Sequence, residues 1–349
     1  MKEVGYGIVG LGNIGPVHAQ AVNAVKGARL VAVCDKREEL ARDFAKQYGG
    51  TAYTDLGEML KHPGLHAVSL CVPSGARAEL AETVARAGKH IMSEKPLEIT
   101  TARVDRILKA CDKAGVLLGC IFQYRFAEAA QHVRKALDQG RFGKLVLGDA
   151  YIKWYRSQAY YDSGAWRGTW KLDGGGALMN QGIHQIDLLQ WFMGPVKSVH
   201  ARIATVAHER IEVEDLATVM LEFENGAHGV IEGSTAIWPG HPARVEVHGT
   251  QGSAVIEDGK LVFWDFVKKR AADEKILAAM KGESELGTGA GDPLKGLKIE
   301  GHRRQIEDFV RAIRTKRPPA IGGREGRKAI ALLEAIYKSA KSGKTIKVT

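Results

Sequence analysis

The chain has 349 residues, of which 45% are hydrophobic, 26% are charged and 41 are glycine. At roughly 150 residues per domain, this length predicts two domains, each large enough for its own core. The composition is that of a globular protein rich in turns, and it excludes collagen-like, disordered and coiled-coil classes.

The chain carries 50 Lys and Arg against 40 Asp and Glu, a net charge of +10 that favours phosphates, nucleotides and other anions. The basic residues are dispersed and accompany no nucleic-acid-reading motif, so we expect no nucleic-acid partner. We find neither a signal-peptide core nor an apolar run near the roughly 18 residues of a membrane span. The four separated cysteines indicate reduced thiols and no metal site. These features predict a cytoplasmic protein without membrane contact.

The first third alternates β-branched or apolar runs with helical patterns, as a parallel sheet with crossover helices does. The strand-like runs are residues 6–9, 30–34, 67–72, 90–92 and 116–121, and the helical patterns are residues 37–48, 77–87 and 101–114. We therefore predict an α/β fold with a doubly wound, dinucleotide-binding Rossmann domain over residues 1–122.

The remaining residues, 123–349, predict an α+β domain with an open, mainly antiparallel sheet for substrate binding and oligomerisation. Helical patterns cover residues 128–139, 178–192, 302–315 and 324–341. The last two helices could pack against the first domain. Strands are expected at residues 145–154, 196–206, 217–223, 228–234, 243–248, 254–257 and 261–266, with turns at Asn225-Gly226 and Asp258-Gly259. For residues 267–300 we predict a surface excursion, that is, a loop that extends from the domain.

A glycine-rich turn follows the first strand directly and opens a helix. Its sequence is Gly10-Leu11-Gly12-Asn13-Ile14-Gly15, with Pro16 in the first helical turn. Gly10 permits the sharp turn, Gly12 lets a pyrophosphate approach the backbone, and Gly15 allows close helix packing. The helix N-terminus supplies amides and a partial positive charge for the phosphates.

The second strand ends at Asp35, 20 residues after Gly15, where a carboxylate can accept both ribose hydroxyls of the adenosine. This position predicts NAD. The adjoining Lys36 and Arg37 are suited to a 2′-phosphate, so NADP remains the second choice.

Two further segments follow parallel strands at their carboxyl ends, where ligands bind in such sheets. Pro73 and Ser74 follow one strand, and Glu94-Lys95-Pro96 follows the next. Proline rigidifies the turn after Lys95, and the strand end directs this lysine toward the expected cleft. We include all these positions except Pro96 among the candidate cofactor-binding residues.

A glycine loop, residues 173–176, leads into the helix expected at 178–192. On one helix Asn180, His184 and Asp187 would share a polar face, at spacings of four and three. If the two domains pack as expected, such a stripe would project from the glycine loop toward the cleft beside the Rossmann domain.

Taken together, Gly-x-Gly-x-x-Gly, Glu-Lys-Pro and a glycine loop leading to His-x-x-Asp resemble the Gfo/Idh/MocA oxidoreductase family. The resemblance also includes Tyr124-Arg125-Phe126 at the domain junction and the late segment 301–309. It implies hydride transfer with a nicotinamide cofactor, a sugar or polyol on the antiparallel sheet, and a homodimer or homotetramer built through those sheets.

The resemblance further implies that Lys95, Asn180 and His184 surround the reacting carbon. Asn180 departs from the family, where an Asp usually stands, because an amide cannot accept a proton. Arg77 departs as well, since many relatives have a histidine there. Asp187 would then fix the tautomer of the His184 imidazole.

Residues 153–170 concentrate three of the six tryptophans and three of the nine tyrosines. Aromatic faces stack on pyranose rings, while arginines bind hydroxyls or carboxylates. The candidate substrate-binding residues are therefore Tyr124, Arg156, Tyr160, Trp166 and Arg167, together with Lys95, Asn180 and His184. The alternative is an oligomer-interface patch. The segment resembles the family branch that acts on glucosides or on nucleotide-linked uronic acid sugars.

We expect oxidation, or the reverse reduction, of a secondary ring hydroxyl, most readily at carbon 3 of a pyranoside. His184 would accept the hydroxyl proton and Lys95 would stabilise the developing alkoxide without a metal. Two alternatives stay open: a glycosidase that oxidises its substrate transiently with NAD, and a noncatalytic NAD-sensing regulator.

Overall fold

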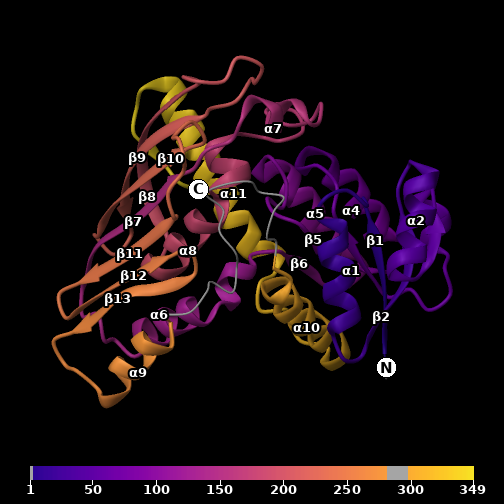
Figure 1. Cartoon of the computed structure of the whole chain (residues 1–349), viewed down its shortest axis with the longest axis horizontal. Coiled ribbons are helices and arrows are strands. Elements are labelled where there is room, and N and C mark those ends of the chain that lie inside the picture. Colours follow the sequence, from indigo (N-terminus) through magenta and orange to yellow (C-terminus); the bar gives the residue numbers. More distant parts are fainter. Residues whose placement is uncertain (1–2, 281–297) are drawn as a thin grey trace. The chain divides into compact units, whose positions relative to one another are not determined.

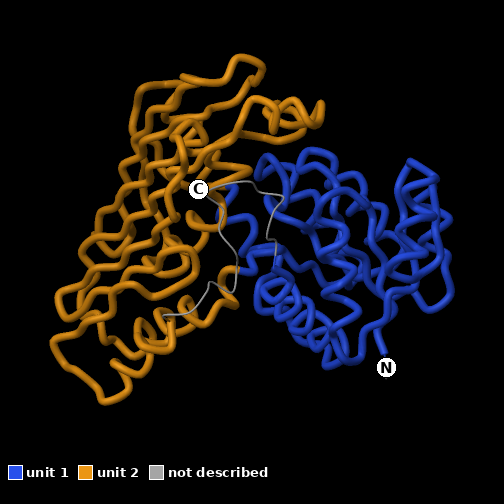
Figure 2. The backbone as a smooth tube through the Cα atoms, in the orientation of Figure 1, with its two compact units in different colours: residues 1–123, 298–330 blue, residues 124–297, 331–349 orange. Residues whose placement is uncertain are grey.

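The computed structural model describes residues 3–280 and 298–349. The chain divides into two units, residues 1–123 with 298–330 and residues 124–297 with 331–349 (Figure 2). No helix within the described residues is long and apolar enough to cross a membrane. Of the expected surface excursion, residues 281–297 lie outside the described ranges, and Ala271–Ala279 forms helix α9.

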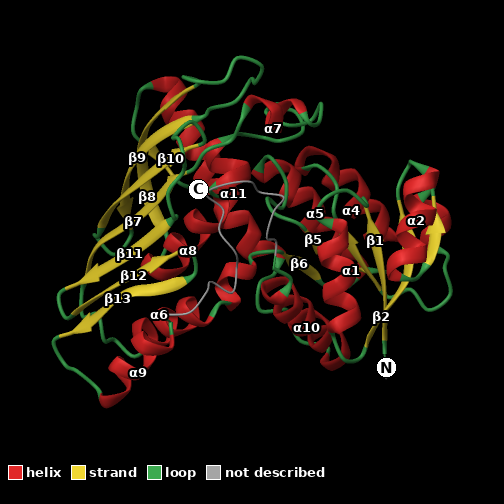
Figure 3. Ribbon diagram, viewed as in Figure 1, coloured by secondary structure: helices red, strands yellow, loops and turns green. Residues whose placement is uncertain are grey.

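The first unit contains a six-stranded parallel sheet in the order β3-β2-β1-β4-β5-β6, which confirms the predicted doubly wound domain (Figures 1 and 3). The strands are β1 (Val4–Val9), β2 (Ala28–Cys34), β3 (Thr51–Tyr53), β4 (Ala67–Leu70), β5 (His90–Ser93) and β6 (Leu118–Cys120). Short β3 lies outside the sequence prediction, because three residues carry too little periodicity. The strand order reverses between β1 and β4, which is where such sheets bind ligands.

Helices cover both faces of this sheet, as right-handed crossovers running in opposite directions require. They are α1 (Gly15–Ala24), α2 (Glu38–Tyr48), α3 (Leu56–Leu60), α4 (Arg77–Arg86), α5 (Thr101–Ala114) and α10 (Glu300–Thr315). α4 packs on α5, and α10 packs on α1. Ile306, Phe309 and Val310 of α10 lie in the core cluster beside β1 and α1. The late helix therefore completes the hydrophobic core of the dinucleotide-binding domain.

The second unit contains an eight-stranded, mostly antiparallel sheet in the order β13-β12-β11-β7-β10-β9-β8-β14, and it confirms the predicted class. Its strands are β7 (Leu145–Lys153), β8 (Val196–Ala204), β9 (Leu216–Phe223), β10 (His228–Ser234), β11 (Arg244–Gly249), β12 (Gly252–Glu257), β13 (Lys260–Phe266) and β14 (Ile346–Lys347). β7 and β10 pair in parallel, which makes the sheet mixed. Asp258 and Gly259 both have positive φ, as the predicted two-residue hairpin turn requires.

The helices of this unit are α6 (Glu128–Asp138), α7 (Gln158–Asp162), α8 (Ile183–Met193) and α9, while α11 (Gly323–Ser342) spans the division after Ile330. α8 packs on β7 and β11, and α6 packs on β12 and β13. One face of the sheet is thereby covered.

The prediction of one continuous α-helix over residues 178–192 is wrong at its N-terminal end. Ala177–Gln181 is a π-helix, and α8 begins only at Ile183. The amide of Gly182 donates to the carbonyl of Ala177 at 2.9 Å, and a Cβ at Gly182 would lie 3.0 Å from that oxygen. The wider turn changes the register, so Asn180 and His184 do not share one regular α-helical face.

Candidate active site

The glycine-rich turn joins β1 to α1 as predicted. Gly10 has φ +87°, and a Cβ there would lie 2.8 Å from the carbonyl oxygen of Cys71. At Gly12 a Cβ would meet no atom within 4 Å. The backbone at Gly12 is therefore open to a ligand, and Asn13, Ile14 and Gly15 lead into the helix N-terminus. This arrangement fits a dinucleotide pyrophosphate.

Asp35 follows β2 at the same sheet edge. Its carboxylate accepts from Leu11 N at 3.0 Å, from Arg37 N at 3.0 Å, and from Arg37 Nε and Nη2 at 3.0 and 3.2 Å. Burial opposes ionisation, but these hydrogen bonds outweigh it and lower the pKa of Asp35. Because the Arg37 side chain is 67% exposed, a ribose can displace its guanidinium and take the vacated acceptor positions.

Pro73 and Ser74 follow β4, and Glu94 and Lys95 follow β5 at the same edge of the sheet. Lys36 is exposed next to Asp35. The first unit therefore carries all the candidate cofactor-binding residues at the carboxyl ends of β1, β2, β4 and β5.

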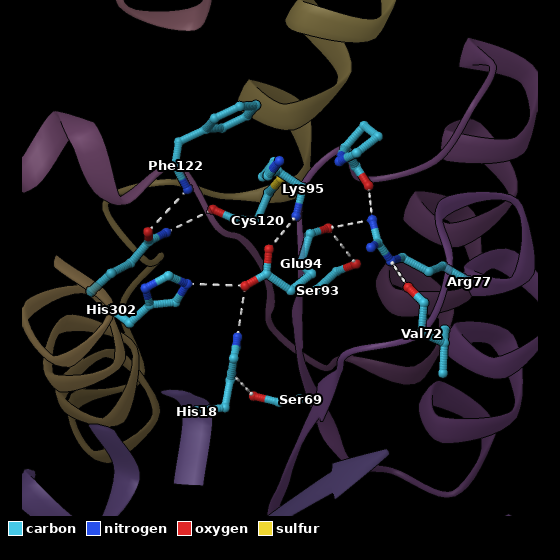
Figure 4. Close-up of polar contacts among 12 residues, drawn as sticks. His18, Ser69, Val72, Arg77, Ser93, Glu94, Lys95, Cys120, Phe122 and His302 are labelled. Atoms are coloured by element: carbon cyan, nitrogen blue, oxygen red, sulfur yellow. Dashed lines mark hydrogen bonds and ion pairs between the residues drawn. The ribbon is translucent and has the colours of Figure 1, made fainter. Parts of the chain in front are cut away.

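The turn that carries Lys95 is held by the buried side chain of Arg77, which lies beside it (Figure 4). Its Nη1 donates to the carbonyl of Glu94 at 2.8 Å and to that of Pro96, and its Nε donates to Val72 O at 3.0 Å. Arg77, the departure from the family pattern, therefore fixes three backbone carbonyls around Lys95.

In the second unit, the ring of Tyr124 stacks on the imidazole of His184, with centroids 4.4 Å apart and planes 12° apart. The next residue, Arg125, donates to both oxygens of Asp187 at 2.8 and 2.6 Å. Arg125 was not among the predicted site residues. Asp187 thus has an arginine partner that the sequence does not reveal, because the two residues are 62 positions apart.

Asn180 is anchored through its amide nitrogen. Nδ2 donates to Asp173 Oδ1, and Asp173 Oδ2 accepts from Gly168 N at 2.9 Å. This contact fixes which side of the amide carries the nitrogen and therefore which side carries the acceptor oxygen Oδ1. The carboxylate of Asp173, seven residues earlier in the chain, therefore holds the amide of Asn180 in place. The sequence alone does not reveal this contact.

Glu214 holds the glycine loop that precedes Asn180. The buried carboxylate accepts from Gly176 N at 3.0 Å, Leu178 N at 2.9 Å and the Tyr337 hydroxyl at 3.0 Å. A Cβ at Gly176 would lie 2.0 Å from Glu214 O, so only glycine fits. No sequence motif identifies Glu214, which lies 38 residues from Gly176.

The aromatic segment centres on the hydroxyl of Tyr160 in α7. Arg167 Nη1 donates to this oxygen at 2.6 Å, and Gln181 Nε2 donates at 2.9 Å. The Arg167 guanidinium also lies 4.3 Å from the Tyr160 ring centroid and 4.6 Å from that of Trp166. Gln181, the last residue of the π-helix, thus connects the aromatic segment to the turn that carries Asn180. Sequence reasoning missed this residue.

Arg156 differs from Arg167 in being buried. Its Nε donates to Gln181 Oε1 at 2.9 Å, and its Nη1 donates to Tyr155 O at 2.7 Å. Arg156 therefore supports Gln181 from within the protein.

Comparison with known proteins agrees with this arrangement. Residues 4–122 match the oxidoreductase family with an NAD-binding Rossmann fold, and residues 130–255 match the GFO/IDH/MocA C-terminal domain. The chain belongs to the Gfo/Idh/MocA oxidoreductase family. It is accordingly an NAD-dependent oxidoreductase, and the resemblance inferred from the motifs is confirmed.

Three relatives illustrate the range of the family. The WlbA dehydrogenase from Bordetella pertussis, solved in complex with NADH and UDP-GlcNAcA, is 34% identical, with a TM-score of 0.91 and coverage of 100% of this chain and 98% of that chain. Inositol 2-dehydrogenase of Rhizobium meliloti is 30% identical over 99% of both chains. Myo-inositol 2-dehydrogenase of Thermotoga maritima is 28% identical over 98% of both chains.

The geometry at Asp35 predicts a preference for NAD over NADP, because a 2′-phosphate would face this carboxylate. Asp35→Ala should weaken NADH binding by roughly ten- to a hundredfold, as expected for lost hydrogen bonds to a charged group. It should also reduce the difference in affinity between NADH and NADPH. Fluorescence titration of both cofactors measures this. Asp43→Ala, which removes a 73% exposed carboxylate of α2, is the control. Tighter binding of NADPH to the unmutated protein would contradict the prediction.

The environment of Glu94 predicts acid sensitivity. Burial opposes ionisation of Glu94, but hydrogen bonds from His18 and His302 hold its pKa well below its usual range, while burial lowers the pKa of His18. Both groups therefore take up protons more readily in the unfolded chain, His18 below about pH 6.5 and Glu94 below about pH 4.3. The melting temperature should fall with pH through these windows.

The Glu94→Gln variant should melt at a lower temperature than the unmutated protein at neutral pH. Below about pH 5 its melting temperature should fall less on acidification than that of the unmutated protein. Melting curves from pH 4 to 8 measure the difference, with Glu39→Gln on exposed α2 as the control. The same pH slope in Glu94→Gln and the unmutated protein would rule out this contribution.

Proposed function

We propose that this enzyme oxidises a secondary ring hydroxyl of an anionic pyranoside, at carbon 3, with NAD as the hydride acceptor. The observation that carries the proposal is the hydroxyl of Tyr160, which receives donors from Arg167 and Gln181. A phenol oxygen has two acceptor positions and one proton. With both acceptor positions filled, its proton is available for a substrate oxygen, and no described residue accepts it.

Burial raises the pKa of Tyr160, so the phenol stays protonated at neutral pH. A phenol donor beside the Arg167 guanidinium suits a group rich in acceptors, above all a carboxylate. The exposed aromatic surface of the same segment, with Trp170 40% exposed, suits stacking on a sugar ring. A uronic acid sugar provides both features. The 34% identical WlbA dehydrogenase, solved with UDP-GlcNAcA, supports this substrate class.

In the proposed mechanism, His184 accepts the hydroxyl proton directly or through a water. Its stacking on Tyr124 holds the imidazole plane while the proton moves. Lys95 donates to the same oxygen and stabilises the developing alkoxide, and Asn180 orients the neighbouring hydroxyl through its acceptor oxygen. Bound NAD supplies the hydride acceptor, so that loss of a proton and a hydride leaves a ketone. The same groups serve the reverse reduction.

A second candidate substrate is a cyclic polyol, because the two inositol dehydrogenases match nearly the whole chain. Uronates, UDP-linked uronates, neutral glycosides and inositols, assayed with NAD, separate the two candidates. We expect net NADH and the largest kcat/KM with an anionic pyranoside. Aglycone release without net NADH would identify a transient-oxidation glycosidase, and inositol as the best substrate would replace our proposal.

We further propose a homodimer or homotetramer that acts in the cytoplasm. Leu147 of β7 and Met220 of β9 are 38% and 60% exposed, and strand register places both on the sheet face opposite α8. The four cysteines form no disulfide within the described residues, as a reducing compartment favours.

Lys95→Met and His184→Ala should each lower kcat by roughly 10²- to 10⁴-fold, the range for a lost proton acceptor or oxyanion donor. Asn180→Ala should lower it less, because only orientation is lost. Steady-state kinetics with NADH titration measures both effects, and the NADH affinity of the His184 and Asn180 variants should change little, because neither residue is a candidate cofactor-binding residue. Lys109→Met, at an exposed position of α5, is the control for the lysine. Full turnover of His184→Ala would remove this residue from the mechanism.

Tyr160→Phe should raise KM for an anionic sugar by about tenfold, the effect of one hydrogen bond to a charged group, and leave NADH binding unchanged. Arg167→Gln should act in the same direction. Tyr161→Phe is the matched control, because its hydroxyl bonds to Thr235 Oγ1 at 2.9 Å within the protein. If Tyr160→Phe and Arg167→Gln alter the oligomer but not KM, the aromatic segment is an interface.

A further inference from the structure

Two histidines that lie far apart in the sequence converge on one buried carboxylate oxygen, which belongs to Glu94 (Figure 4). Oε1 of Glu94 lies 2.8 Å from Nε2 of His18 in α1 and 3.0 Å from Nε2 of His302 in α10. The three residues are 4% exposed or less. We call this the Glu94 cluster. The proposed chemistry above uses neither histidine.

The environment of each ring fixes its tautomer. His18 Nδ1 lies 2.8 Å from the hydroxyl of Ser69, which can donate to it, and His302 Nδ1 is buried with no described partner. A proton on His302 Nδ1 would be a buried donor without an acceptor, which is unfavourable. Because an ionised carboxylate can only accept, Nε2 of each ring carries a proton and donates it to Glu94 Oε1.

The other oxygen of the cluster holds Lys95. Glu94 Oε2 accepts from the backbone N–H of Lys95 at 3.0 Å. The peptide carbonyl of Glu94 is held in turn by Arg77, which also holds the carbonyl of Pro96. The backbone on both sides of Lys95 is therefore fixed by buried groups, and its side chain starts from a defined point.

We infer that His302 and His18 are positioning residues for Lys95, acting through the carboxylate of Glu94. This inference rests on the proposed role of Lys95. Holding a catalytic group in place matters because a displacement of about 1 Å can lower a rate by roughly 10²-fold. His18 lies one turn after the glycine-rich loop, so the cluster also ties the helix that would receive the pyrophosphate to the turn that carries Lys95.

Two histidines and a glutamate are also a known set of zinc ligands. Here each ring nitrogen lies at hydrogen-bond distance from the same oxygen, and the donors and acceptor match without an ion. The geometry thus favours a hydrogen-bonded cluster. Zinc binding by the cluster is an outcome of the test below.

The test compares two amides at position 302. In His302→Gln the amide nitrogen reaches about the place of Nε2 and can donate to Glu94, whereas in His302→Asn it is one methylene short. We expect His302→Asn to lower kcat by about ten- to a hundredfold, with NADH affinity and sugar KM within about twofold, and His302→Gln to recover most of the loss. Arg311→Ala, on the exposed side of α10, is the control.

A double-mutant cycle with Lys95→Met gives the decisive readout. If His302 acts through Lys95, His302→Asn should not lower the residual rate of Lys95→Met any further. An equal loss in both backgrounds, or the same kcat for the Asn and Gln variants and the unmutated enzyme, would overturn the inference. So would zinc bound stoichiometrically at the cluster, with activity lost on chelation and restored by zinc. Full turnover of Lys95→Met would instead overturn the proposed function.

Discussion

A buried carboxylate must be compensated, and the dinucleotide-binding unit is organised around this requirement. Glu94 lies in the interior, where an uncompensated charge would cost several kcal/mol. Its partners come from α1, from α10 and from the peptide that follows it. The compensation therefore joins segments as distant as residues 18 and 302 and at the same time fixes the turn that carries Lys95.

The second unit uses the same principle. The buried carboxylate of Glu214 binds two amides of the glycine loop, and its neighbour Asp215 binds the amides of residues 206–208. His208, which is paired with Asp215, lies 2.8 Å from the carbonyl of Arg156. Two adjacent acidic residues thus position the loop before Asn180 and the arginine that supports Gln181. Loops that lack regular hydrogen bonding gain fixed geometry in this way.

Much of the fold could be predicted from the sequence, because local patterns encode it. Period-two and helical runs identify both sheets, and Gly10, Gly12 and Asp35 identify the dinucleotide edge through spacing alone. The π-helix at Ala177–Gln181 could not be predicted, since it depends on Glu214, an anchor that lies more than 30 positions away.

The same limit applies to the pairings within the site. His302 belongs to a recognisable late segment, but its contact with Glu94 spans 208 positions. The stacking of Tyr124 on His184 also requires tertiary packing. Sequence reasoning therefore identifies which residue types carry the chemistry, whereas the groups that orient them appear only in the structure.

The contrast between Lys95 and the aromatic segment bears on how substrates diverge in this family. The turn at Lys95 is constrained by buried groups on every side, so a substitution there disturbs both a charge and a core. The side chains of Arg167 and Trp166 are partly exposed, so a substitution there disturbs the core less. Under the proposed function, selection for a new sugar or polyol can therefore act on the partly exposed Trp166 and Arg167 while the turn at Lys95 stays fixed. Under the proposed function, this separation accounts for one fold that accommodates relatives named for inositols and a relative solved with a nucleotide-linked sugar.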